Sequence, residues 1–242
     1  MTRIPPELTD RIIDFLHSDR QALATCALVC KSWIPSSRLH LFETLYLASS
    51  KILKLTHFLD SNDSTIERHV RTLKVVDGWV VFGRLAQHLS RFPALKSLIL
   101  HGVHIDIHEL DDPCLWFHGI TNLDVMSFYF KGPGHFCRFL NAFPLLEMLR
   151  ADFSYLGSHF STGGATISLP LCIRILHIVI SSSILLNIHF PPLAELTLCN
   201  VATKDLVDIN HWFRSLPPTL RVFNIRFLSY ISKHVVLSRM EQ

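Results

Sequence analysis

The sequence is poor in charged residues and has no cluster of basic side chains. Only 18% of its 242 residues are charged, whereas 49% are hydrophobic. This composition excludes a disordered chain, because it supplies enough apolar side chains to bury a large core. The formal net charge is +3, and the lysines and arginines are scattered. A nucleic-acid groove needs clustered cations to displace phosphate counterions, so we expect no nucleic-acid partner.

The sequence also lacks the marks of a secreted protein. Its six cysteines form no C-x-x-C pair. In a chain of this length we expect them, Cys26 and Cys30 included, to be small buried hydrophobic residues rather than a disulfide framework. Met1 is followed directly by polar sequence, without the apolar stretch of a secretory signal. We therefore expect a reducing compartment, the cytoplasm or the nucleus.

No transmembrane helix is predicted either, although residues 175–194 contain no Asp, Glu, Lys or Arg. Three consecutive serines at 181–183 and the pair Pro191-Pro192 would interrupt a membrane-spanning helix in this window. Two buried strands with a turn between them fit the window better, and we expect no membrane partner.

Catalytic and metal-binding motifs are absent as well. The sequence has no G-x-S-x-G, no P-loop and no H-E-x-x-H, and Gly132-Pro133-Gly134 is interpreted as a turn. One histidine cluster could suggest a metal site, but it follows an expected strand at 98–100 and is interpreted as strand and loop. We expect no metal, no cofactor and no enzymatic activity of the chain itself. The residues of this cluster are His101, His104, Asp106, His108 and Glu109.

What the sequence does contain is a repeat, with apolar residues at relative positions 1, 4 and 6. Successive first positions are 20 to 28 residues apart. Positions 4 and 6 point to the same side of a strand, so each unit has one apolar edge that only a neighbouring unit can cover. The repeats are Phe42-Leu45-Leu47, Val70-Leu73-Val75, Leu95-Leu98-Leu100, Ile120-Leu123-Val125, Leu146-Leu149-Ala151, Ile173-Leu176-Ile178, Leu193-Leu196-Leu198 and Leu220-Phe223-Ile225.

The segments between these triplets favour helices or loops that return the chain to the next strand. Apolar residues recur at helical spacing near 52–59, 82–89 and 206–216. The dipeptides Phe92-Pro93, Phe143-Pro144 and Phe190-Pro191 each precede an expected strand, and proline favours extended backbone before it. The spacer 153–170 contains two adjacent glycines and no helical stripe, so we expect a loop there.

The period and the L-x-x-L-x-L core of this pattern resemble leucine-rich repeats. The resemblance implies an α/β solenoid with parallel strands on a concave face and helices or loops on a convex face. The family usually has Asn three residues after position 6, whereas this chain has Gly78, Val103, Phe128, Ser154, Ser181, Val201 and Leu228 there. An ordinary α/β domain with leucine-rich strands remains an alternative.

The first 41 residues predict a separate three-helix module, leaving 42–242 as the repeat domain. Pro5 and Pro6 mark a helix start, and Ser18 or Asp19 can cap the second helix. A third helix is expected to carry Cys26, Val29 or Cys30, and Trp33, and to end at Pro35. So short a module cannot bury all its apolar side chains internally, so part of them should contact the first repeat and part a partner protein.

This module resembles an F-box, through I-P-P-E-L, I-I-D-F-L, C-A-L-V-C-K-S-W and R-L-H-L-F. The resemblance implies docking onto the Skp-type adaptor of an SCF-type (cullin–RING) ubiquitin ligase, and so a substrate-recognition subunit that binds an unknown protein target. A helical cap on the repeats is the alternative for the module alone. The resemblance assigns adaptor contacts, direct or supporting, to Ile4, Pro5, Leu8, Ile12, Ile13, Leu16, Leu23, Leu28, Val29 and Trp33.

The target would bind the outward side chains of the strands. The central column between positions 4 and 6 is predicted to be Tyr46, Lys74, Ile99, Asp124, Arg150, His177, Thr197 and Asn224. Flanking columns add Ser97, His101, Asn122, Met126, Met148, Asp152, Glu195 and Arg226. Such a mixed surface suits protein or peptide recognition. Two other functions stay open: a repeat scaffold outside any ubiquitin ligase, and a small hydrolase on an unrecognised α/β fold.

Overall fold

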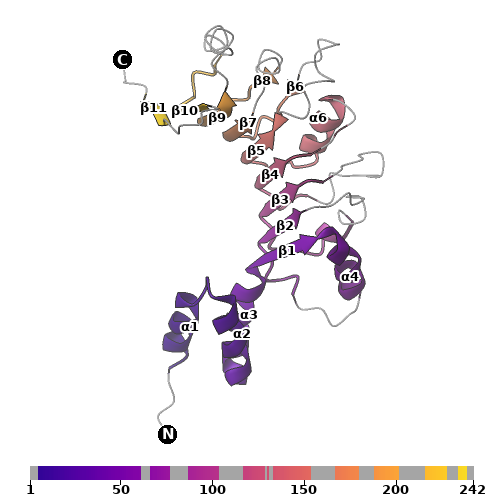
Figure 1. Cartoon of the computed structure of the whole chain (residues 1–242), viewed down its shortest axis with the longest axis vertical. Helices are drawn as coiled ribbons and strands as arrows, with labels where there is room; N and C mark the ends of the chain where they lie inside the picture. Colours follow the sequence, from indigo (N-terminus) through magenta and orange to yellow (C-terminus); the bar gives the residue numbers. More distant parts are fainter. Residues whose placement is uncertain are drawn as a thin grey trace.

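The computed structural model describes residues 5–60, 66–76, 87–103, 117–128, 130, 133–153, 167–179, 188–201, 216–227 and 234–238. The chain has a mixed α/β fold in which several helices accompany a parallel sheet. The molecule is elongated, with a helical module (residues 5–43) at one end and the strands stacked in sequence order away from it (Figure 1). We call residues 44–238 the strand region.

The helical module consists of α1 (Pro6–Phe15), α2 (Arg20–Val29), the 3-10 turn η1 (Lys31–Trp33) and α3 (Ile34–Glu43). The predicted cap of the second helix is confirmed, because Asp19 Oδ1 accepts hydrogen bonds from the backbone N–H groups of Gln21 and Ala22 at 3.0 and 2.9 Å. The expected third helix is wrong in its limits. Cys26 and Val29 lie on α2, and Pro35 lies in the first turn of α3, where a missing N–H is tolerated.

Nine strands form the main sheet, in the order β1-β2-β3-β4-β5-β7-β9-β10-β11. All neighbours are parallel except the terminal pair β10 and β11, which is antiparallel. Its strands are β1 (Thr44–Ala48), β2 (Thr72–Val76), β3 (Ser97–His101), β4 (Asn122–Met126), β5 (Met148–Asp152), β7 (Ile175–Val179), β9 (Glu195–Val201), β10 (Val222–Phe227) and β11 (His234–Ser238).

Each of the eight predicted triplets contributes one of these strands, with positions 4 and 6 inside it. The strands pair in register, so that Leu73, Leu98 and Leu123 occupy equivalent places on neighbouring strands. Positions 4 and 6 are buried almost throughout and join one continuous core. Before most strands the position-1 N–H closes a turn, as Leu95 does by donating to the Phe92 carbonyl oxygen at 3.1 Å.

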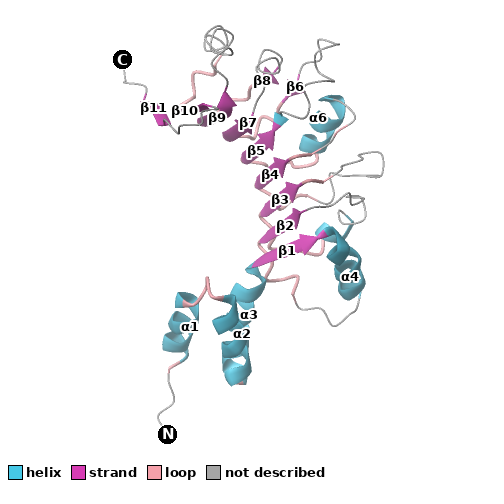
Figure 2. Cartoon of the chain, in the orientation of Figure 1, coloured by secondary structure: helices cyan, strands magenta, loops and turns pink. Residues whose placement is uncertain are grey.

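Helices α4 (Ser49–Asp60) and α6 (Pro133–Asn141) lie on the same side of the main sheet (Figure 2). The predicted stripe at 52–59 is confirmed in α4, where Ile52 and Leu59 are buried. The turn expected at 132–134 is wrong, because Pro133 and Gly134 begin α6. The helical stripes expected at 82–85 and 206–213 lie outside the described residues.

A second, two-stranded parallel sheet pairs β6 (Ile167–Ser168) with β8 (Ile188–His189). Strand β6 was not expected, because it lies in the spacer that was predicted to be only a loop, whereas β8 lies in the window 175–194 where two strands were expected. Ile167 is fully buried and Ile188 nearly so, and both join the main core. In the window considered for a membrane helix, β7 and β8 confirm the expectation of two strands. Among the described residues no helix is long and apolar enough to span a membrane.

Candidate functional site

The helical module has a small core of its own. Ile13 from α1 and Leu23 from α2 are fully buried, and Cys26 is nearly so. None of the three belongs to the continuous core of the strand region, which begins at Leu47. The module therefore buries few apolar side chains, and its fold leaves the others outside.

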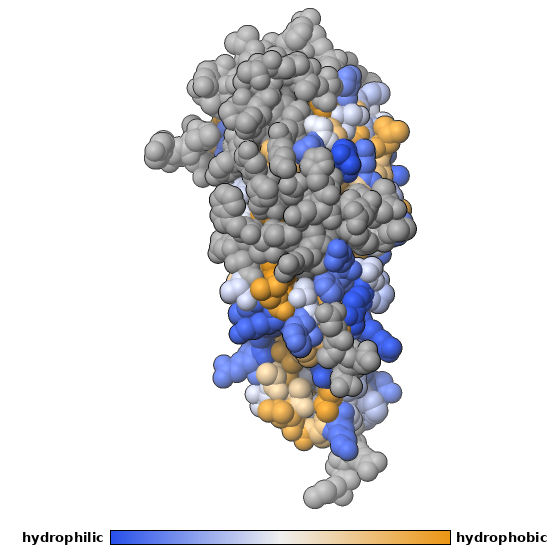
Figure 3. All heavy atoms as spheres, turned by 90° about the vertical axis from the view of Figure 1, so that its right-hand side faces the viewer, coloured by the Kyte–Doolittle hydropathy of each residue, from blue (hydrophilic) through white to orange (hydrophobic). Residues whose placement is uncertain are grey.

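Five large apolar side chains remain exposed on the module, and we call them the exposed apolar set. Phe15 and Leu28 are the extreme cases, with 85% and 87% of their surface exposed. Figure 3 shows hydrophobic side chains gathered at the end of the molecule that carries the helices. On α1, three members of the set follow each other at spacings of four and three residues, which places them on one helix face. The set comprises Leu8, Ile12, Phe15, Leu28 and Val29.

The structure separates the predicted adaptor residues into two groups. Leu8, Ile12, Leu28, Val29 and also Pro5 are exposed, whereas Ile13 and Leu23 are buried inside the module and can act only as support. Leu16 and Trp33 are partly buried, and Ile4 lies outside the described residues. Phe15 was missed, although its spacing from Leu8 and Ile12 in the sequence carries the signal.

A groove of about 810 Å³ lies beside this set, between the start of α1 and the end of α2. Cys30 is exposed there, which corrects its expected burial. The Cys30 Sγ lies 3.0 Å from the Ser32 hydroxyl, and this hydrogen bond lowers the pKa of the thiol. The groove is lined by Pro5, Pro6, Thr9, Asp10, Val29, Cys30, Ser32 and Trp33.

The module is joined to the sheet without a linker, because α3 ends at Glu43 and β1 begins at Thr44. His40 Nε2 lies 2.8 Å from Asp14 Oδ1, which ties α3 to α1. Arg20 donates to the Thr44 carbonyl oxygen at 3.3 Å, and the Arg71 N–H donates to the Glu43 carbonyl oxygen at 2.9 Å. These contacts hold the two regions together.

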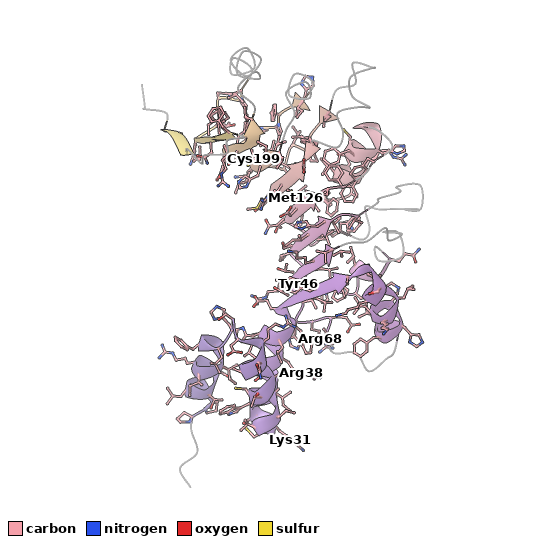
Figure 4. The ribbon with its side chains drawn as sticks, in the orientation of Figure 1. Lys31, Arg38, Tyr46, Arg68, Met126 and Cys199 are labelled. Carbon is pink, nitrogen blue, oxygen red and sulfur yellow. The ribbon has the colours of Figure 1, made fainter. Side chains whose placement is uncertain are left out.

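The second candidate surface is the sheet face formed by the outward side chains of the strands. The predicted central column is confirmed as one row, since Tyr46, Lys74, Ile99, Asp124 and Arg150 are register partners from strand to strand. The row continues through His177, Thr197 and Asn224. Tyr46, Met126 and Cys199 mark strands β1, β4 and β9 in Figure 4.

Polar contacts link neighbouring side chains across this face. The Lys74 ammonium lies 5.8 Å from the centre of the Tyr46 ring. Asp124 lies between two bases, with His101 Nε2 at 3.6 Å from Oδ1 and Arg150 Nη1 at 3.8 Å from Oδ2. The resulting surface is mixed in charge.

Farther along the face, His177 Nε2 is 3.3 Å from Glu195 Oε1. Thr197 is 97% buried, although its place in the predicted column implied an exposed side chain. It accepts a hydrogen bond from the Asn224 amide at 3.4 Å. In the flanking columns Asp152 is buried too. These two positions support the surface rather than form it.

The other expectations about chemistry have mixed outcomes. Within the described part of the chain no group of His, Cys, Asp or Glu could hold a metal ion. His101 lies in β3, as expected, and the rest of that histidine cluster lies outside the described residues. Cys26 is buried and a free thiol, and Cys137, Cys172 and Cys199 are partly buried free thiols.

No protein-family model matches the chain, and no curated protein matches it either.

Proposed function

We propose that this chain is the substrate-recognition subunit of an SCF-type ubiquitin ligase in the cytoplasm or nucleus. Its helical module would be an F-box that docks onto a Skp-type adaptor. Its strand region would be a leucine-rich-repeat solenoid that holds a protein target. The chain would perform no bond chemistry, and would act by raising the effective concentration of the target near the ubiquitin-conjugating enzyme.

The observation that carries this proposal is the exposed apolar set on so small a module. Apolar side chains as exposed as Phe15 and Leu28 are stabilised by about 1.5–3 kcal/mol each when a partner covers them fully. Four members of the set, all except Phe15, are residues that the F-box resemblance assigns to the adaptor contact, and Pro5, which it also assigns, is exposed too. A cap that only covered the end of the sheet would need a polar outer face, whereas Phe15 and Leu28 are exposed on this module.

The strand region supports the receptor half of the proposal through its geometry. Eight strands repeat one apolar pattern in register, and the outward columns carry acids, bases, methionines and an exposed tyrosine. Such mixtures are typical of surfaces that bind proteins, because apolar contacts supply affinity and polar pairs supply specificity.

The test is capture of the purified Skp-type adaptor by the purified full chain. The variant Phe15→Asp/Leu28→Asp should lose at least about a hundredfold in affinity, because two buried contacts of about 1.5–3 kcal/mol each disappear. Both side chains are exposed, so the variant should keep the circular dichroism spectrum and melting temperature of the wild type. Trp33 is left intact, because it is partly buried and its loss would mix binding with folding.

Leu171→Asp is the matched control, since Leu171 is 81% exposed in the strand region and should not affect adaptor capture. If the folded wild type captures no adaptor, or the double variant captures it as well as the wild type does, the ligase proposal is wrong. A repeat scaffold that acts outside a ubiquitin ligase would then be the better-supported hypothesis for the function.

A further inference from the structure

The charges of the sheet face are unevenly distributed along the strand order. Strands β1, β2 and β3 contain no Asp or Glu, and β2 contributes the cation Lys74. The acids of the face, Asp124, Asp152 and Glu195, lie on β4, β5 and β9. The strands nearest the helical module, where Tyr46 marks β1 in Figure 4, therefore carry positive charge and no negative charge.

Two further cations extend this basic end of the sheet at the turns that precede β2 and β3. Arg71 and Lys96 are exposed, and each follows the buried first residue of a repeat triplet. The Arg71 carbonyl oxygen accepts hydrogen bonds from the backbone N–H groups of Lys96 and Ser97 at 2.9 and 3.0 Å. Since the two cations hold the same place in adjacent repeats, their side chains start about 5 Å apart, at the same edge of the sheet.

None of these three cations is held tightly within the protein. Arg71 Nη1 lies 3.6 Å from Glu43 Oε1, and the two side chains are 59% and 41% exposed, so this ion pair is weak. The Lys74 ammonium lies 5.8 Å from the centre of the exposed Tyr46 ring. Within the described part of the chain the Lys96 ammonium has no hydrogen bond or ion pair.

We infer that Arg71, Lys74 and Lys96 form a basic patch that binds an acidic segment of the target protein. This inference rests on the proposed role of the sheet face in holding a protein target. Arg71 and Lys96 are adjacent, so they can share one carboxylate, to which arginine donates two parallel hydrogen bonds. Lys74 lies three residues farther along β2, about 10 Å from Arg71, and can bind a second carboxylate.

Pairing of the strands gathers these cations, although the lysines and arginines are scattered in the sequence. A nucleic acid fits the basic patch less well than an acidic peptide does. Three cations would displace few phosphate counterions, and two carboxylates flank the patch. These are Glu43, which contacts Arg71, and Glu67, which precedes β2 and is paired with Arg91 at 3.0 Å.

The test measures binding of the purified full chain to pools of nine-residue peptides in which the three central residues are fixed and the others are mixed. The fixed residues are three Glu, three Gln or three Lys. At low ionic strength the wild type should retain the Glu pool about tenfold better than the Gln pool, because charge-assisted hydrogen bonds are stronger than neutral ones. Raising the salt to about 0.5 M should weaken that preference, because exposed charges are screened.

The variant Arg71→Gln/Lys96→Gln should lose most of the preference, and it should keep the melting temperature of the wild type because both side chains are exposed. Arg174→Gln/Arg221→Gln is the matched control. These two exposed arginines hold the same repeat position before β7 and β10, but Ala194 lies between them in the backbone ladder, so they do not form an adjacent pair. The control should keep the preference.

Three results would overturn the inference: equal retention of the Glu and Gln pools by the wild type, an unchanged preference in the Arg71/Lys96 variant, or an equal loss in the control variant. Tighter binding of a single-stranded oligonucleotide of matched charge than of the Glu pool would overturn it as well. Adaptor capture separates this inference from the ligase proposal, because the Arg71/Lys96 variant should capture the adaptor as the wild type does. A wild type that prefers the Glu pool but captures no adaptor would refute the ligase proposal alone.

Discussion

The two regions of this molecule differ in how far they bury their apolar side chains. In the helical module Ile13, Leu23 and Cys26 are buried, while five larger or equally apolar side chains face outward. In the strand region nearly every apolar residue at positions 1, 4 and 6 is buried in one continuous core. Both regions have similarly apolar sequences, so composition does not cause the difference.

Geometry causes it. Each strand is covered by its neighbours on both sides, so adding repeats extends one core without creating new apolar surface. Three helices of ten residues cannot enclose the same share of their surface. The comparison teaches that an exposed leucine on the module has a different meaning from one in the strand region. On the module it belongs to the exposed apolar set, which three short helices cannot cover.

The largest expected effect comes from one substitution made in both regions. Phe139 on α6 is fully buried among aromatic rings, with Phe143 at 5.0 Å and Phe130 at 5.4 Å between ring centres. Phe139→Ala should lower the free energy of unfolding by about 3–5 kcal/mol, because it removes buried surface and leaves a cavity. Phe15→Ala should change it by less than about 0.5 kcal/mol.

Urea denaturation followed by circular dichroism measures both values. A loss of more than about 1 kcal/mol in Phe15→Ala would mean that this side chain is buried in the free protein, and the exposed apolar set would lose its strongest member.

The next largest effect is a difference in thiol reactivity between Cys30 in the helical module and Cys137 in the strand region. The thiolate is the form that reacts with iodoacetamide. Hydrogen bonding to Ser32 lowers the pKa of Cys30, whereas burial raises the pKa of Cys137. Below the ordinary thiol pKa, Cys30 should therefore be more ionised and more accessible, and should react at least about tenfold faster than Cys137.

Peptide mass spectrometry after timed alkylation near neutral pH reports each cysteine separately. Ser32→Ala should raise the pKa of Cys30 and slow its alkylation, with Cys137 unchanged. Equal rates at the two cysteines in the wild type would show that the surroundings assigned to Cys30 are wrong.

The strands could be predicted from the sequence because their signal is periodic. Positions 4 and 6 of all eight triplets fall in strands, and the central column was predicted residue by residue. A period repeated many times averages out local irregularities. The same pattern could not show that Thr197 is buried, because burial of an outward residue depends on the size of its neighbours on adjacent strands.

Helix α6 was missed although its signal is present. Phe136, Phe139, Leu140 and Phe143 follow helical spacing, but the sequence Gly132-Pro133-Gly134 by itself favours a turn. Proline and glycine are compatible with the first turn of a helix, where no internal hydrogen bond to their nitrogens is needed.

The residues at or just after the ends of three strands show a second feature that the sequence pattern did not reveal. Val103, Phe128 and Val201 stand where leucine-rich repeats usually place Asn, and all three are buried. The residue before each has a left-handed backbone, at Gly102, Ser127 and Asn200. The left-handed residue therefore directs the apolar side chain that follows it into the core, a role that spacing from the strand alone did not indicate.

The smallest expected effect comes from removing the helix cap at Asp19, and its measurement tests whether the two regions unfold independently. Asp19→Ala removes the acceptor for the N–H groups of Gln21 and Ala22 and should destabilise α2 by about 1 kcal/mol. Asp19→Asn keeps an acceptor oxygen and should cost much less, because Asn caps helices about as well as Asp.

Hydrogen exchange measured by mass spectrometry should show faster exchange in the helical module of Asp19→Ala and unchanged exchange in strands β3 to β9. Since the cores of the two regions share no buried residue, the weakened cap should not reach the sheet. Faster exchange in those strands would mean that α3 and β1 transmit the change, and that the two regions unfold as one cooperative unit.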